Sequence, residues 1–161
     1  MTAHLVIGLI AAAITFSLTP LVRMLAVHIG AIDHPNDRKV HAEPTPSLGG
    51  LAIFAGVVGA GVAASYLGEF ADIFRQSSAP LGVLGGAIVI FALGAVDDLH
   101  DLPAPVKLAG QVFAAGILFL TGVKMQFLLL PDGNLYSLSD DVSVLVTVIW
   151  IVAMINAVNL V

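Results

Sequence analysis

The chain has 161 residues, of which 58% are hydrophobic and 11% are charged, with a mean hydropathy of +1.02. A soluble domain of this length cannot bury so much apolar surface, so the composition indicates an integral membrane protein. Six lysines and arginines against 11 acids leave a net charge of −5 and no basic patch for nucleic acid, and the lack of cysteine excludes disulfides and thiolate metal sites.

Five apolar runs of 18 to 20 residues divide the chain, at Leu5–Val22, Leu48–Leu67, Ala79–Val96, Ala104–Val123 and Val142–Val161. Each is long enough to cross a hydrocarbon core of about 30 Å as a helix that rises about 1.5 Å per residue. No basic residue precedes the first run, so we expect a retained span and not a cleaved signal. The sequence therefore predicts an all-α, polytopic membrane protein with five transmembrane helices in a single membrane domain, residues 1–161.

Basic residues are distributed unevenly over the connections between these runs. The first and third connections, with the helix ends beside them, carry Arg23, Arg38, Lys39 and Lys107, whereas the second and fourth carry Arg75 and Lys124. Because cytoplasmic loops are enriched in lysine and arginine, the first and third connections are predicted to be cytoplasmic. The N-terminus is then predicted to lie outside.

The first connection, residues 33–50, is the most polar stretch of the chain. Arg38, Lys39 and His41 offer hydrogen-bond donors suited to phosphate oxygens. Gly49-Gly50 would let a ligand or another helix approach the start of the second run. An ordinary positive-inside loop is the alternative interpretation. The second connection, residues 68–78, has no informative pattern.

Glycine is dense in the second and third runs, at Gly49, Gly50, Gly56, Gly59, Gly61, Gly82, Gly85 and Gly86. Small residues at such spacings allow two membrane helices to approach closely. We take these glycines as a packing signal and assign them no chemistry.

Three carboxylates follow the third run within five residues: Asp97, Asp98 and Asp101. If the helix continues, Asp101 shares a face with the other two, and like charges about 6 Å apart at an effective dielectric of about 20 repel by roughly 3 kcal/mol. A hard divalent cation with oxygen ligands, Mg²⁺ or Mn²⁺, would relieve that repulsion. In the alternative, Asp101 caps the following helix, with Pro103 in its first turn, and the other two acids are solvated at a membrane boundary.

The fourth connection and the fifth run each carry one local signal. Two short extended runs around Asp132-Gly133-Asn134 predict a β-hairpin on the outer face, near residues 125–138. Asn156 and Asn159 share a helix face at the predicted cytoplasmic end, where their amides should face a polar cavity or bond to another helix. The helical pattern stops at Val161 without a cap, so we expect a truncated chain.

Taken in order, the polar residues form three groups: Asp33-x-Pro35-x-x-Arg38-Lys39-x-His41-x-x-Pro44-Thr45-Pro46-x-x-Gly49-Gly50, Asp97-Asp98-x-x-Asp101-Leu102-x-x-x-x-Lys107-Leu108-x-x-Gln111, and Asn156-x-x-Asn159. This pattern resembles the polyprenyl-phosphate N-acetylhexosamine-1-phosphate transferases, also called glycosyltransferase family 4. It is most similar to the bacterial branch that moves GlcNAc-1-phosphate onto undecaprenyl phosphate. The phospho-MurNAc-pentapeptide transferase branch is the alternative. Ser47 departs from the basic residue of many relatives, which puts one phosphate contact in doubt.

The resemblance implies a Mg²⁺- or Mn²⁺-dependent enzyme of the bacterial plasma membrane, with its active face in the cytoplasm and the bilayer around it. There a lipid phosphate attacks the sugar-bearing phosphorus of UDP-GlcNAc, or of a related UDP-N-acetylhexosamine, and UMP leaves. This is the first membrane step of cell-envelope polysaccharide synthesis. A homodimer is one assembly that the resemblance allows.

Specific roles follow from the same resemblance. Asp97 and Asp98 are the candidate catalytic carboxylates, and Asp98 and Asp101 the candidate metal ligands. The candidate substrate-binding residues are Arg38, Lys39, His41, Lys107, Asn156 and Asn159. Asp97 is the proposed base, although a phosphate monoester with a second pKa of about 6 is already mostly dianionic at neutral pH. Family members continue with an Asp-Gly pair, a later catalytic acid and a His-containing loop, so the resemblance covers about the N-terminal half and the fragment alone should be inactive.

Three rivals remain. An intramembrane prenyltransferase would need Asn where Val96 stands and Asp where Pro105 stands. A transporter would show ionisable groups near mid-membrane and broken helices in repeated halves, and neither is visible. The third is an inactive membrane remnant.

Overall fold

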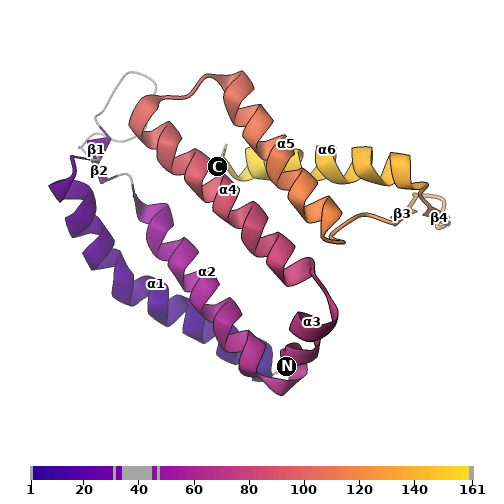
Figure 1. Cartoon of the computed structure of the whole chain (residues 1–161), viewed down its shortest axis with the longest axis horizontal. Coiled ribbons are helices and arrows are strands. Elements are labelled where there is room, and N and C mark those ends of the chain that lie inside the picture. The colour runs from indigo at the N-terminus through magenta and orange to yellow at the C-terminus, as the bar shows by residue number, and fades with distance from the viewer. Residues whose placement is uncertain (1, 31, 34–44, 47, 160–161) are drawn as a thin grey trace. The chain divides into compact units, whose positions relative to one another are not determined.

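The computed structural model describes residues 2–30, 32–33, 45–46 and 48–159. Helices dominate these ranges, with four short strands between them (Figure 1). The elements are α1 (Thr2–His28), β1 (Ile32–Asp33), β2 (Thr45–Pro46), α2 (Gly49–Tyr66), α3 (Gly68–Gln76), α4 (Ala79–His100), α5 (Ala104–Leu120), β3 (Phe127–Leu129), β4 (Leu135–Ser137) and α6 (Asp140–Asn159). The predicted all-α class is confirmed.

Each of the five predicted apolar runs is helical over most of its described residues. Four helices, α1, α2, α4 and α6, are long and apolar enough to cross a membrane, and α5 is a shorter apolar helix of 17 residues. The helix α5 ends before the predicted Val123 because Gly122 turns the backbone to a φ of +94°. The chain is thus a multi-pass membrane protein, while the count of five spans and the orientation stay predictions.

One helix lies where no element was predicted. This helix, α3, has nine residues. At its start the Leu67 carbonyl accepts hydrogen bonds from the backbone N–H groups of Phe70 and Ala71. Its sequence, GEFADIFRQ, is amphipathic, because apolar residues recur three and four positions apart. The Phe70 ring meets the His4 ring of α1 edge-on, with 4.9 Å between their centroids.

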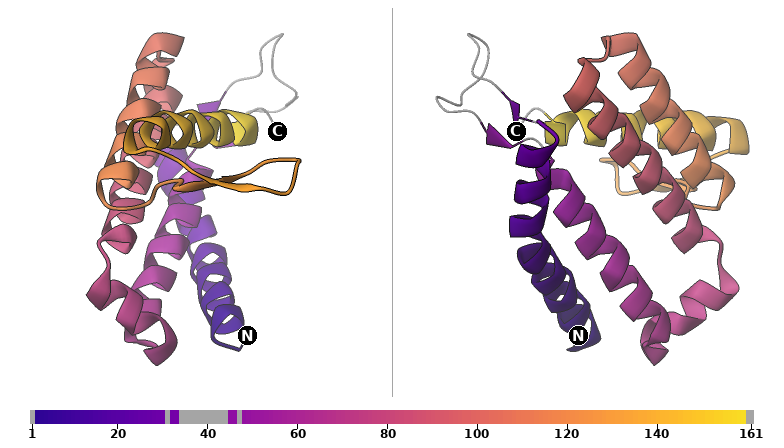
Figure 2. Two further views of the ribbon diagram at one scale, coloured as in Figure 1. Left: turned by 90° about the vertical axis from the view of Figure 1, so that its right-hand side faces the viewer. Right: turned by 60° about the vertical axis from the view of Figure 1, so that its left-hand side comes forward.

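The chain divides into two compact units, of which the first contains Met1–Arg75 and Phe91–Leu102. Within it α1 and α2 run side by side (Figures 1 and 2). The buried residues of α2 recur every four positions, at Ala52, Gly56, Ala60 and Ala64. A Cβ added at Gly56 would overlap Thr15 of α1, and one at Gly59 would lie 2.6 Å from Ile14 Cδ1. Small side chains therefore form this helix contact.

The second unit contains Gln76–Ile90 and Pro103–Val161, and its α4 segment packs on α5 in the same way. A Cβ at Gly82 would overlap Thr121, and one at Gly86 would overlap Leu118. The packing role predicted for the glycines is confirmed at Gly56, Gly59, Gly82, Gly85 and Gly86. At three others, Gly49, Gly50 and Gly61, no described residue lies within 4 Å of an added Cβ, so the structure shows no close packing there among the described residues.

The predicted β-hairpin is confirmed. Strands β3 and β4 pair antiparallel, with Leu128 opposite Tyr136. Asp132 shapes the turn: its Oδ1 accepts the Asn134 backbone N–H at 2.9 Å, and Gly133 follows at a φ of +81°. A second pair, β1 with β2, was not predicted; it brings Asp33 opposite Thr45.

Candidate active site

The acidic cluster lies at a sharp end of α4. The helix ends at His100, and Asp101 takes a left-handed conformation with a φ of +48°. Two bonds to Asp97 close the turn: the Asp101 N–H donates to the Asp97 carbonyl at 2.8 Å, and the Leu102 N–H donates to Asp97 Oδ1 at 2.9 Å. The helix therefore ends before Asp101, so the continued helix on which the shared face of the three acids depended is not present.

The capping alternative for Asp101 is also wrong. The N-cap of α5 is Pro103, with φ −65° and ψ 145°, and no side chain caps this helix. The Pro103 carbonyl accepts the N–H groups of Val106 and Lys107 at 3.0 and 3.3 Å. Asp101 lies two residues earlier, in a left-handed conformation that Asp and Asn tolerate better than other side chains.

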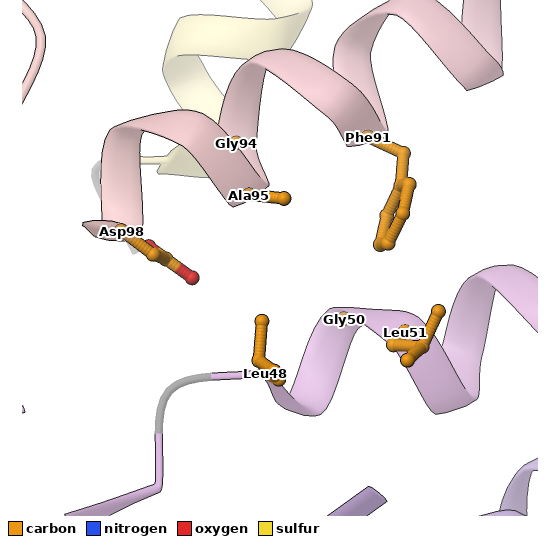
Figure 3. A pocket seen from close by; sticks show the side chains of 7 residues that line it. All are labelled: Leu48, Gly50, Leu51, Phe91, Gly94, Ala95 and Asp98. Atoms are coloured by element: carbon orange, nitrogen blue, oxygen red, sulfur yellow. The ribbon is translucent and has the colours of Figure 1, made fainter. Parts of the chain in front are cut away.

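Asp98 points into a pocket of about 220 Å³ between the start of α2 and the last turns of α4 (Figure 3). The other lining residues are Leu48, Gly50, Leu51, Phe91, Gly94 and Ala95. No described residue lies within 4 Å of a Cβ added at Gly50 or Gly94, so these glycines widen the space. Phe91 stacks on Phe54, with centroids 4.7 Å apart. The described lining of this pocket thus combines apolar residues with the Asp98 carboxylate.

Sequence reasoning found part of this pocket. The Gly49-Gly50 pair signalled a close approach at the start of α2, and Gly50 does line the recess. Leu48, Leu51 and Phe91 were missed because an apolar side chain in a membrane helix has no local signal that distinguishes a pocket wall from a lipid-facing surface.

The described residues do not assemble a complete metal site. Within residues 2–30, 32–33, 45–46 and 48–159, no three His, Asp or Glu side chains form a group that could hold a metal ion. Asp97 Oδ1 is engaged by the Leu102 N–H, and Asp101 has left the helix. The described side chains thus do not fit Mg²⁺ or Mn²⁺ by themselves, and the assignment of Asp98 and Asp101 as its ligands stays a prediction.

The remaining candidates on described elements lie in the second unit. Lys107 is half-buried in the first turn of α5, and Asn159 is exposed at the end of α6. Asn156 of α6 bonds to Gln111 of α5 at 2.7 Å, from Nδ2 to Oε1. The alternative of interhelical hydrogen bonding is confirmed for Asn156. Gln111 was part of the motif, yet sequence reasoning did not count it as a site residue.

Three predicted substrate contacts, Arg38, Lys39 and His41, fall outside the described residues. Their role as phosphate-binding residues stays a prediction.

Comparison with known proteins finds one family model and several named relatives that are similar to this chain. The model of the family described as glycosyl transferase family 4 matches residues 80–161. The decaprenyl-phosphate N-acetylglucosaminephosphotransferase of Mycobacterium tuberculosis (strain ATCC 25618 / H37Rv) is 41% identical over 157 residues, which is 96% of this chain and 39% of that protein.

Two further relatives carry similar names. The probable undecaprenyl-phosphate N-acetylglucosaminyl 1-phosphate transferase of Bacillus subtilis (strain 168) is 40% identical over 144 residues, 89% of this chain and 38% of that protein. The undecaprenyl-phosphate alpha-N-acetylglucosaminyl 1-phosphate transferase of Thermotoga maritima is 29% identical over 150 residues, 93% of this chain and 43% of that protein. The chain thus spans well under half the length of these relatives. No solved structure matches it.

Proposed function

The chain belongs to glycosyl transferase family 4, and we propose that the protein transfers GlcNAc-1-phosphate, or a related N-acetylhexosamine 1-phosphate, from a UDP-sugar to undecaprenyl phosphate. The observation that carries this proposal is the sequence identity of 40–41% to proteins named as GlcNAc-phosphate transferases, over 89–96% of the chain. Those names divide between decaprenyl and undecaprenyl acceptors, so the acceptor class is a polyprenyl phosphate.

In the proposed reaction, an oxygen of the lipid phosphate attacks the sugar-bearing phosphorus of UDP-GlcNAc. A new P–O bond forms, and the bond from that phosphorus to the bridging oxygen breaks. UMP leaves with the bridging oxygen and its electron pair, and the product is a lipid pyrophosphoryl sugar. Such a transfer depends mainly on positioning and on neutralising charge on phosphate oxygens.

We assign the acids different roles within this scheme. Asp97 is a positioning residue, because its carboxylate and its carbonyl hold the turn that carries Asp101 and Leu102. Proton abstraction adds little there, since the attacking phosphate is already mostly dianionic at neutral pH. Asp98, in the pocket between α2 and α4, is the carboxylate that we place against the reacting groups.

The counter-charge for these anions comes from several proposed sources. Lys107, Arg38, Lys39 and His41 would contact phosphate oxygens, and Asn159 would line the site. Mg²⁺ or Mn²⁺ remains our proposal as the cofactor, with Asp98 and Asp101 as candidate ligands in a site that further residues complete. We place this site on the cytoplasmic face of the bacterial plasma membrane, because the first and third connections carry most of the basic residues.

The test uses membranes that contain the full-length protein, supplied with UDP-GlcNAc and either undecaprenyl or decaprenyl phosphate. We expect UMP release that needs the lipid acceptor, and we expect Asp98→Asn to lower the rate by about 100-fold or more. Asp132→Asn in the hairpin is the matched control and should retain the rate.

Two results would contradict the proposal. One is the absence of UMP release with either acceptor. The other is full turnover in Asp98→Asn, which would remove this carboxylate from the site. UMP release only from UDP-MurNAc-pentapeptide would instead assign the chain to the other branch of the family.

A further inference from the structure

A buried polar side chain of α5 holds one of the candidate site residues. Gln111 is only 7% exposed, and its neighbours Ala114 and Ala115 on the same helix are buried too. Its Oε1 accepts from Asn156 Nδ2 at 2.7 Å, and its Nε2 donates to Asn156 Oδ1 at 3.4 Å. A buried amide requires such partners, so this reciprocal pair is a built contact between α5 and α6.

The backbone fixes which way round the Asn156 amide points. Asn156 Nδ2 also donates to the Val152 carbonyl at 2.8 Å. A carbonyl oxygen can only accept, so the atom beside it must be the nitrogen. Gln111 then faces that nitrogen with its own oxygen. Both N–H bonds of Asn156 are therefore used within the second unit.

Among the described residues, Oδ1 is the Asn156 side-chain atom that has hydrogen-bonding capacity left. Oδ1 has two lone pairs and takes one bond, the longer one from Gln111. Asn156 is an exposed residue of α6, unlike Gln111. A phosphate oxygen at neutral pH needs a donor, which this amide cannot supply in the observed orientation. A hydroxyl or an amide N–H fits the free lone pair.

We propose that Gln111 is a positioning residue that orients Asn156 so that its Oδ1 accepts a hydrogen bond from the UDP-sugar. This inference rests on the proposed function and refines it. From the sequence, Asn156 is a general substrate-binding candidate, whereas the amide pair restricts that role to recognition of a hydroxyl or N–H group of the donor substrate.

Steady-state kinetics of the full-length protein in membranes test this role. Asn156→Ala should raise the KM for UDP-GlcNAc about tenfold and change kcat little, because one substrate hydrogen bond is lost. Gln111→Met keeps the length of the side chain and removes both amide bonds, so it should raise the same KM about fivefold. Gln111→Glu keeps the acceptor for Asn156 Nδ2 and should recover part of that loss.

The combined variant gives the sharpest result. If Gln111 acts only through Asn156, Gln111→Met with Asn156→Ala should be no worse than Asn156→Ala alone. Thr147→Val is the matched structural control, because Thr147 is also buried on α6 and accepts the Met125 N–H at 2.9 Å. Thr147→Val should lower thermal stability and leave the KM for UDP-GlcNAc unchanged. Its effect on stability should be the same with and without Asn156→Ala.

Several kinetic outcomes would overturn the proposal. Independent, multiplicative effects of Gln111→Met and Asn156→Ala would show that Gln111 does not act through Asn156. A raised KM for the lipid acceptor, or a raised Mg²⁺ requirement with an unchanged KM for UDP-GlcNAc, would assign Asn156 to another ligand.

A geometric test separates this inference from the proposed function. Residues 1–161 contain no cysteine, so Gln111→Cys combined with Asn156→Cys should be joined by a short, membrane-permeant reagent with two thiol-reactive methanethiosulfonate groups, each of which forms a disulfide and releases a sulfinate. Val112→Cys with Asn156→Cys is the control and should react less, because residue 112 points about 100° away around the helix. Equal cross-linking would overturn the pairing whatever the activity. A protein that releases no UMP overturns the proposed function and the ligand assignment, while the cross-link still decides the pairing.

Discussion

Two regions of the molecule pair their polar side chains with different partners. The regions are the acidic turn after α4 and the amide pair of Gln111 on α5 with Asn156 on α6. In the turn, Asp97 accepts backbone N–H groups that lie four and five residues ahead. In the pair, Gln111 bonds to a side chain 45 residues away. The residues that follow a helix still have backbone N–H groups to pair, as Leu102 does after α4. The N–H groups of a helix interior are already paired within the helix, so an interior amide finds its further partner on another helix. The turn is therefore a local structure, and the amide pair depends on helix packing.

The largest effect is expected where close packing sets the helix distances of the second unit. Gly82→Ala would place a methyl group against Thr121, whose Oγ1 is held by the Ile117 and Leu118 carbonyls. Overpacking of this kind typically lowers the free energy of unfolding by about 1–3 kcal/mol. A thermal melt in detergent measures the loss.

Gly116→Ala is the control for that experiment. No residue of the described ranges lies within 4 Å of an added Cβ at Gly116, in the interior of α5. There the change should stabilise by about 0.5–1 kcal/mol, because alanine loses less backbone entropy than glycine in a helix. The two changes should thus have opposite signs, and equal signs would contradict the packing role of Gly82.

A second prediction concerns the left-handed residue of the turn. Asp101→Val should cost about 1–2 kcal/mol of stability, because a β-branched side chain is strained at a φ of +48°. Asp101→Asn should cost little, since Asn tolerates this conformation, although it removes the charge. Loss of activity in Asp101→Asn without loss of stability, measured by a melt and by UMP release, would separate the carboxylate's chemistry from the turn. Equal melting temperatures of the two variants would contradict the left-handed turn.

Asp97 gives a smaller and more selective test of the local region. Asp97→Ala removes the acceptor of the Leu102 N–H and should lower stability by about 0.5–1.5 kcal/mol. Asp97→Asn keeps a carbonyl oxygen at the same position, so it should preserve the turn. If positioning is the main role of Asp97, UMP release should fall much less in Asp97→Asn than in Asp97→Ala. A similar loss of UMP release in both variants would show that the reaction depends on the charge of Asp97 and not on its hydrogen bond to the turn.

The same contrast explains which features the sequence could predict. Apolar runs, glycine packing and the Asp-Gly-Asn hairpin are patterns within about twenty residues. The structure confirms the helices, the hairpin and the packing role of five of the eight glycines. The end of α4 was harder to predict, because no residue near Asp101 stops a helix except Pro103, two positions later. The amphipathic α3 was missed because nine residues between two long spans were treated as a connection.

The partner of Asn156 could not be predicted from spacing. Gln111 and Asn156 each lie in a run of otherwise apolar residues, so each amide required a partner, but nothing in either run identifies the other. Helix packing decides it. The same holds for the pocket beside Asp98, whose walls come from segments 40 residues apart. Residues with chemistry could thus be identified one by one, while their groupings needed the fold.

The smallest effect is expected in the hairpin. There Asp132, like Asp97 in the turn after α4, accepts a backbone N–H group from a residue close to it in the sequence. The Asn134 N–H groups that bond to Asp132 hold the pKa of its carboxyl below the ordinary 3.8, with a weaker contribution from the Tyr136 hydroxyl. A lowered pKa means that the ionised form favours the folded turn. The stabilisation is complete above the ordinary value and is lost as the pH falls through the lowered pKa. Amide hydrogen exchange at Asn134 should therefore accelerate only below about pH 3.8. Asp132→Asn keeps the acceptor without a titrating proton, so its exchange should lack that acid transition; the same transition in this variant would assign the effect to another group.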